Sequence, residues 1–188
     1  MPASRSTSKL TKQEQEQLLD LARRSIVKYP KKAELGSLPE RLKEKHGVFV
    51  SMYLGKELRG CIGHILPHEP LCTSVRECSV SAAYYDDRFP RLTQEEAQNV
   101  KIEISVLTDP VRLHYVNAAA ILRKLRTSEG VILKRGMNTA TFLPQVWKHF
   151  LSRGEFLRQL CHKAGLAPDA WKDSDAEVYV YSVQKFRG

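Results

Sequence analysis

Apolar residues at helical spacing dominate the start of the chain. Thr11 and Glu14 have the spacing of a capping box, and apolar side chains then recur every three or four positions as far as Pro30. This pattern predicts an amphipathic helix that begins after Thr11 and ends before Pro30. A second cap at Ser37 predicts a short helix that ends at Gly47.

Strand-like patterns follow in pairs. Two apolar runs, 48–54 and 58–65, are joined by a Gly-Lys-Glu turn and predict a β-hairpin. Apolar and polar residues alternate over 100–106, as they do in a half-buried strand. A second hairpin is predicted over 131–143, and the run 178–183 predicts the last strand.

Further helices are predicted between these strands. Apolar spacing indicates one over 71–85, a cap at Thr93 begins another, and caps at Asn117 and Ser152 begin two more. The last of these ends at Gly165. Strands therefore come as neighbouring pairs interspersed with helices, without regular alternation. This order favours an α+β fold with a largely antiparallel sheet and flanking helices.

Composition narrows the class of protein. The chain has 188 residues, of which 42% are apolar and 27% are charged, as in ordinary globular proteins. No stretch approaches about 18 consecutive apolar residues, and the polar, basic start lacks the apolar region of a secretion signal. We therefore expect a cytoplasmic protein that does not contact a membrane. The four cysteines form no CxxC pair, and we expect reduced thiols.

Positive charge is concentrated in one part of the chain. The formal net charge is +9, and residues 111–163 carry 10 basic and 2 acidic side chains. Five basic residues lie within thirteen positions there, namely Arg123, Lys124, Arg126, Lys134 and Arg135. They indicate a surface for nucleic acid or another polyanion. The alternative is that these charges only solvate the outer face of a helix whose inner face is apolar.

The segment Leu58–Gly63 carries the most unusual chemistry. It reads Leu-Arg-Gly-Cys-Ile-Gly, which puts the thiol of Cys61 between two glycines on a predicted strand. Glycine inside a strand indicates a bulge or the close approach of another backbone or a ligand. In a regular strand Arg59 lies on the same side as Cys61 and, in a sheltered site, favours its thiolate. The alternative is that Cys61 is a small buried residue that fits between the glycines.

Several motifs together resemble one known family. They are LRGCIG at 58–63, Asp86–Phe89, Ile102–Thr108, Phe142–Trp147 and Phe156–Leu166. In this order, from about Leu10 to Phe186, they resemble the AMMECR domain family, which includes the AmmeMemoRadiSam system protein A of bacteria and archaea. The chain departs from the family at Asp87, where the family commonly has proline.

The resemblance implies a domain organisation and a set of partners. It implies an AMMECR domain over residues 10–188, after a flexible tail at 1–9. A larger lobe comes from both chain ends and a smaller lobe from the middle, and these two lobes of unequal size are expected to form a cleft near the cysteine motif. Genomic association with Memo-like and radical-SAM proteins implies that these are partners.

Transferring the motifs residue by residue marks eight candidate site residues. We predict that Cys61 is a catalytic nucleophile and that Glu103 is a catalytic base. The predicted substrate-binding residues are Arg59, Gly60, Gly63, Asp86, Arg88 and Gln145. His64 lies three positions from Cys61 and so on the opposite face of a regular strand, which makes it a poor base.

The sequence does not favour a metal site and leaves two functions open. Cys61, His64 and His68 are of types that bind zinc, but Pro67 keeps the two histidines off one regular helix, and we expect no metal and no cofactor. The first function is a cysteine-dependent enzyme or accessory factor in a modification system. The second is a non-catalytic binding module for nucleic acid or a partner protein. An enzyme should enclose Cys61 with converging polar groups, whereas a binding module should present an open face.

Overall fold

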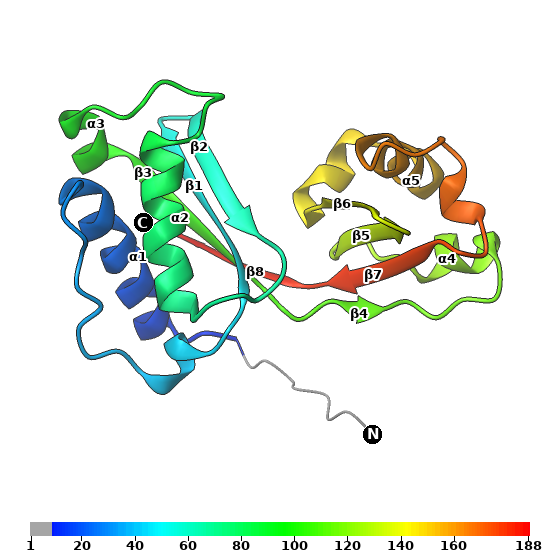
Figure 1. Cartoon of the computed structure of the whole chain (residues 1–188), viewed down its shortest axis with the longest axis horizontal. Coiled ribbons are helices and arrows are strands. Elements are labelled where there is room, and N and C mark those ends of the chain that lie inside the picture. Colours follow the sequence, from blue (N-terminus) through cyan, green and yellow to red (C-terminus); the bar gives the residue numbers. More distant parts are fainter. Residues whose placement is uncertain (1–8) are drawn as a thin grey trace. The chain divides into compact units, whose positions relative to one another are not determined.

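The structure of the protein, a computed structural model, describes residues 9–188 and divides into two compact units (Figure 1). Unit 1 consists of the chain up to Thr108 together with Gln184–Gly188, and unit 2 consists of Asp109–Val183. Each unit has a hydrophobic core of its own. The predicted tail at residues 1–9 lies, except for Lys9, outside the described residues.

A four-stranded sheet forms the centre of unit 1. Its strands are β1 (Gly47–Leu54), β2 (Glu57–His64), β3 (Lys101–Leu107) and β8 (Val183–Arg187), in the order β2-β1-β3-β8. β1 is antiparallel to both β2 and β3. The backbones of Ile102 and Gly188 exchange two hydrogen bonds of 2.8 and 3.0 Å, which is the antiparallel pattern and extends it to β8. β2 and β8 are therefore the two edges of the sheet.

The helices of unit 1 pack against the sheet and against one another. They are α1 (Lys12–Val27), α2 (Leu71–Tyr84), α3 (Gln94–Asn99) and a short 3-10 helix (Glu40–Lys43). α2 packs on β1 and β2, and α1 packs on α2 and β3 (Figure 1). The alternate residues Val48, Val50 and Met52 of β1 are fully buried in the core that these helices share. Because strand side chains alternate, the residues between them point to the face that the helices do not cover.

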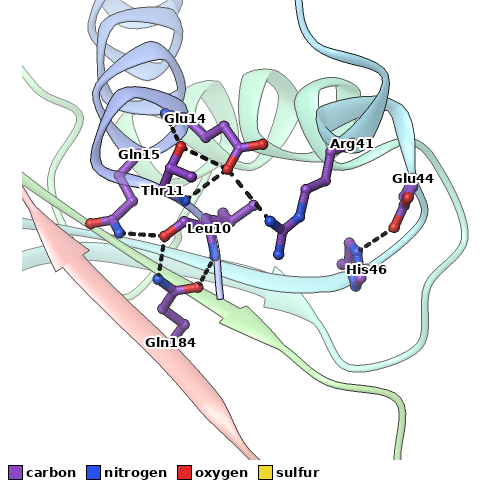
Figure 2. A network of polar contacts seen from close by, with 8 residues as sticks. All are labelled: Leu10, Thr11, Glu14, Gln15, Arg41, Glu44, His46 and Gln184. Atoms are coloured by element: carbon purple, nitrogen blue, oxygen red, sulfur yellow. Dashed lines mark hydrogen bonds and ion pairs between the residues drawn. The ribbon is translucent and has the colours of Figure 1, made fainter. Parts of the chain in front are cut away.

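The first helix is tied to the last strand in unit 1. Thr11 and Glu14 form the predicted capping box, in which the Thr11 amide donates to Glu14 Oε2 at 2.7 Å. The side-chain amide of Gln184 accepts from the Leu10 amide at 2.7 Å and donates to the Leu10 carbonyl at 2.9 Å (Figure 2). Arg41 lies 3.7 Å from Glu14 in the same network. These contacts fix both terminal segments to one sheet.

Unit 2 contains the second four-stranded antiparallel sheet. Its strands are β4 (Val111–Arg112), β5 (Gly130–Arg135), β6 (Asn138–Phe142) and β7 (Glu177–Tyr181), in the order β4-β7-β5-β6. Its helices are α4 (Ala118–Lys124), α5 (Arg153–Lys163) and two 3-10 helices (Pro144–His149 and Ala170–Lys172). In the core, Trp147 stacks on Phe156 with ring centroids 3.5 Å apart. This stacking joins the longer 3-10 helix to α5.

The observed architecture confirms the predicted α+β class and antiparallel pairing. There are two four-stranded sheets, however, where one sheet was predicted. The predicted strand 178–183 was wrong as a single element, because its residues belong to β7 and β8, which lie in different sheets. Over the described part of the chain, no helix is long and apolar enough to cross a membrane. The cleft implied by the resemblance stays a prediction.

Candidate functional site

A row of polar side chains crosses the helix-free face of the sheet in unit 1. The strand register places Cys61 of β2 opposite Ser51 of β1, and Ser51 opposite Glu103 of β3. The paired backbone of Ile102 and Gly188 sets the register that puts Arg187 opposite Glu103. We call Cys61, Ser51, Glu103 and Arg187 the polar row. The structure thus brings both predicted catalytic residues into one line, with Ser51 between them.

Cys61 is the accessible thiol of the described chain. Cys72, Cys78 and Cys161 are 2%, 6% and 0% exposed, whereas Cys61 is partly exposed. The hydroxyl of Ser51 donates a hydrogen bond to Cys61 Sγ at 3.2 Å. This hydrogen bond orients the sulfur from the neighbouring strand.

Glu103 is held by two basic residues from the last strand. It is only 8% exposed, and its carboxylate lies 3.1 Å from Lys185 Nζ and 3.2 Å from Arg187 Nη2. The Arg187 guanidinium also lies 4.6 Å from the ring centroid of Tyr53, and burial, followed by the charge of Glu103, raises the pKa of Tyr53. One carboxylate and two cations leave a net positive charge at this end of the row.

The spacing of the strands decides how Glu103 can act on Cys61. Two strand intervals of about 4.8 Å separate their backbones by about 10 Å. Ser51 fills the position between the two residues. Both carboxylate oxygens of Glu103 are already paired with cations. The geometry therefore favours Glu103 as the residue that positions Lys185 and Arg187.

Asp86 and Arg88 bind the backbone of Cys61 at the open edge of the sheet. Asp86 Oδ2 accepts from the Cys61 amide at 2.8 Å, and Arg88 Nη2 donates to the Cys61 carbonyl at 2.6 Å. The two side chains also pair with each other at 2.7 Å. This arrangement, which we call the edge clasp, fixes the position of Cys61 without touching its sulfur.

The side chain of Arg59 forms an ion pair with a carboxylate outside the polar row. The register of β2 against β1 shifts between Met52 and Tyr53, so Arg59 is an extra residue in a bulge. Its guanidinium binds both oxygens of Glu96, at 2.9 and 3.0 Å. The assumption of a regular strand was therefore wrong at this position. The charge of Arg59 is neutralised by Glu96, and its role in substrate binding stays a prediction.

The two glycines of the motif are explained by close packing. A Cβ atom on Gly60 would lie 1.9 Å from the carbonyl oxygen of Ala82 in α2. A Cβ atom on Gly63 would lie 2.2 Å from the carbonyl oxygen of Val48 and 2.6 Å from the ring of Phe49. Such contacts exclude a side chain, so backbone approach alone accounts for both glycines. Their predicted contact with a substrate is untested.

His64 lies on the helix side of the sheet, as regular alternation predicts. Its Nδ1 is 3.9 Å from the sulfur of Cys78 in α2, and burial lowers the pKa of His64. Burial also raises the pKa of Cys78 to about 12, so this second thiol stays protonated. Neither residue is placed to exchange a proton with Cys61 across the sheet. Within residues 9–188, no group of three or more His, Cys, Asp or Glu side chains could hold a metal ion.

The remaining predicted residues lie in unit 2. Gln145 is exposed in the 3-10 helix Pro144–His149. Of the five clustered basic residues, Arg135 is paired with Asp173 and Asp175, at 2.7 and 2.9 Å. The local ion pairs reduce the charge available to a polyanion at that position, and nucleic-acid binding stays a prediction.

Sequence reasoning missed three residues of the site. Ser51 lies within the apolar run 48–54, and Lys185 and Arg187 lie beyond the last predicted strand. A usable signal was present, because Ser51 stands between the apolar residues Val50 and Met52 in an alternating strand. What the sequence lacked was the strand order that makes these residues neighbours.

Comparisons with known proteins agree with this structure. The chain is 42% identical over 190 residues to Protein MK0488 of Methanopyrus kandleri, covering 95% of this chain and 90% of that one. It is 40% identical to Protein NEQ441 of Nanoarchaeum equitans, covering 87% and 94% of the two chains. The crystal structure of the uncharacterized protein PH0010 from Pyrococcus horikoshii has a TM-score of 0.84 and 35% identity, covering 95% and 93%. The AMMECR1 family matches residues 19–186, and the chain belongs to this family.

Proposed function

We propose that the protein is a cysteine-dependent enzyme in which Cys61 attacks an electrophilic carbon of a negatively charged substrate. The observation that carries this proposal is the hydrogen bond from Ser51 to the sulfur of the one accessible thiol among the described residues. In the attack, Sγ forms a bond to carbon and the thiol proton passes to solvent. The displaced group leaves with the electron pair of the broken bond.

The surroundings of Cys61 support a nucleophile that is held in place. The edge clasp fixes the backbone of Cys61 on both sides, at its amide and at its carbonyl. Ser51 then orients the sulfur from the neighbouring strand. A nucleophile with few positions open to it loses less entropy when it reaches the transition state.

The charge of the polar row supports an anionic substrate. Lys185 and Arg187 carry two positive charges, and Glu103 compensates only one of them. Both basic side chains are partly exposed, so a substrate can reach them. We assign these two residues to substrate binding, and Glu103 to positioning them.

Alkylation of the native protein tests the nucleophile. Because the other three cysteines are buried, iodoacetamide should label Cys61 selectively, as peptide mass mapping would show. The rate at pH 7 should exceed that of a short cysteine peptide. Ser51→Ala should lower it about fivefold to tenfold, the equivalent of one hydrogen bond to the sulfur. Ser105→Ala is the matched control, because Ser105 is also a buried serine of the sheet but has no hydrogen bond to Cys61.

A charged reagent tests the substrate preference. The ratio of the iodoacetate rate to the iodoacetamide rate should be about twofold to fivefold higher for the protein than for the peptide. The double variant Lys185→Gln and Arg187→Gln should lower this ratio to that of the peptide. The difference should shrink at 1 M salt. Equal rates in wild type and Ser51→Ala, with no preference for the anion, would leave Cys61 an ordinary surface thiol and overturn the proposal.

The accessory role differs from the enzymatic one in its partners. The Memo-like and radical-SAM proteins that the resemblance implies are proposed as partners that deliver or receive the group on Cys61. Co-purification of such a protein with wild type, and its loss with Cys61→Ser, would support this role.

A further inference from the structure

Unit 1 contains a cavity that none of the polar row lines. It has a volume of about 340 Å³ and lies between the end of α1, the segment 29–33 and α2. That volume is within the range of small-molecule sites. The lining residues that matter here are Tyr29, Lys31, Lys32, Arg76, Val80 and Tyr85.

The charges around this cavity favour an anion. Lys31, Lys32 and Arg76 bring three positive charges, and Glu77 is the one acidic residue of the lining. Within the described residues, neither lysine forms an ion pair. Glu77 lies 3.6 Å from Arg76 Nη2, which leaves two uncompensated cations at the cavity.

One donor of Arg76 has no partner. Its Nε atom is buried and makes no hydrogen bond within the described part of the chain. A buried guanidinium N–H without an acceptor is unfavourable, since it has lost water and gained nothing in return. An oxyanion in the cavity would supply the acceptor once the Arg76 side chain turns toward it, and guanidinium groups bind phosphate and carboxylate oxygens well.

The rest of the lining fits an aromatic or apolar body. Tyr29 and Tyr85 meet edge to face, with ring centroids 6.1 Å apart, and their hydroxyls are hydrogen-bonded to each other. Tyr29 is also stacked on Tyr84 at 4.5 Å, which holds its ring in place. Val80 adds an aliphatic surface from α2.

We propose that this cavity binds a small organic anion, with its phosphate or carboxylate at Arg76, Lys31 and Lys32 and its apolar body against Tyr29 and Tyr85. The site is separate from the proposed function of Cys61. Its basic residues select for an anion, and its two tyrosines select for an apolar or aromatic body. A neutral compound of the same shape would leave the positive charges of Lys31, Lys32 and Arg76 uncompensated.

Matched probes on the 15N-labelled full chain test this site. Phenyl phosphate and benzoate carry the two oxyanions on one aromatic body, benzyl alcohol is the neutral analogue, and inorganic phosphate lacks the body. We expect at least one aromatic anion to shift the amides of residues 29–33 and 76–81 saturably in the millimolar range. Benzyl alcohol and inorganic phosphate should bind at least fivefold more weakly. The preferred anion then identifies phosphate or carboxylate as the recognised group.

Substitutions decide whether the lining residues bind the probe. Arg76→Gln should weaken the affinity at least tenfold. Because Arg76 is largely buried, the double variant of Lys31→Ala and Lys32→Ala, both exposed, provides a change that leaves the core intact and should weaken binding at least fivefold. Lys28→Ala is the matched control, an exposed lysine outside the lining. Absence of saturable shifts with both anions, or wild-type affinity in the double lysine variant, would overturn the proposal.

Discussion

The hydrogen bonds around Asp86 keep its side chain negatively charged. Its side chain is buried, and it accepts hydrogen bonds from the Cys61 amide and from Nε and Nη2 of Arg88, at 2.8, 2.8 and 2.7 Å. The hydrogen bonds from Arg88, more than any other contact, hold the pKa of Asp86 below its usual value. The residue therefore stabilises the folded state as an anion.

Asp86→Asn should destabilise the protein, and the loss should depend on pH. A carboxyl whose pKa is lowered by folding contributes its full stabilisation above about pH 4, and this is lost as the pH falls through the lowered folded value. At pH 7 the variant should lose about 2 kcal/mol of unfolding free energy, because an amide presents an N–H group to these donors. The loss should become smaller below pH 4.

Urea unfolding at a series of pH values measures this effect. Asp87→Asn is the matched control, because Asp87 is the exposed neighbour in the same turn and should change stability by less than about 0.5 kcal/mol. A loss in Asp86→Asn that stays constant down to pH 2 would contradict the assigned charge.

In the hairpin of β1 and β2, Gly60 allows β2 to lie close to α2. Gly60 lies against the backbone of α2, and no flexible side chain there can move aside for a Cβ atom. Gly55 lies in the turn of the same hairpin with φ +60° and open space around it. Gly60 is therefore required by close packing, and Gly55 by the left-handed conformation of the turn.

Gly60→Ala should destabilise the protein more than Gly55→Ala. We expect about 3 kcal/mol for Gly60→Ala, because α2 has to move away from the sheet. Gly55→Ala should cost about 1 kcal/mol, the strain of a left-handed conformation without a clash. Chemical unfolding of both variants provides the comparison, and an equal or reversed order would argue against the close approach of α2.

The elements differed in how far the sequence could predict them. The starts of α1, α3 and α5 follow the caps at Thr11, Thr93 and Ser152, because capping is a local interaction. The division of 178–183 between two sheets could not be predicted in this way. The run reads Val-Tyr-Val-Tyr-Ser-Val and contains no glycine or proline that would mark a break. Only the pairing with distant strands distinguishes β7 from β8.

The candidate site was predictable in part for the same reason. The motifs identified Cys61 and Glu103, but the order β2-β1-β3 decides that Ser51 lies between them. That order is a property of the assembled sheet. Arg59 was assigned to the side of Cys61 from a regular period of two, which the bulge at this position breaks.

At the scale of the whole molecule, unit 2 is inserted between two neighbouring strands of unit 1. The chain leaves after β3 and returns in β8, which lie side by side in the first sheet. The two ends of unit 2 are also close together, since Val111 in β4 pairs with Val180 in β7. Each unit has its own apolar core, so neither core depends on residues of the other.

Each unit should therefore fold without the other. Residues 109–183 expressed alone should unfold cooperatively on heating and show the circular dichroism of a mixed α and β protein. Unit 1 with a short Asn-Gly turn in place of residues 109–183 should do the same, because such a turn suits an antiparallel pair. An unfolded 109–183 chain at low temperature would show that its core is not self-sufficient.

The edge clasp has a consequence for how the molecules behave together. A bare sheet edge offers a template on which strands from other copies can add, and this is a common origin of aggregates and fibres. In β2 the outward amide and carbonyl of Cys61 are already bound by Asp86 and Arg88. The same two side chains that hold the cysteine therefore also occupy the backbone groups on which a strand from another copy would add, so the outer strand that carries the accessible thiol is protected from intermolecular pairing at this residue.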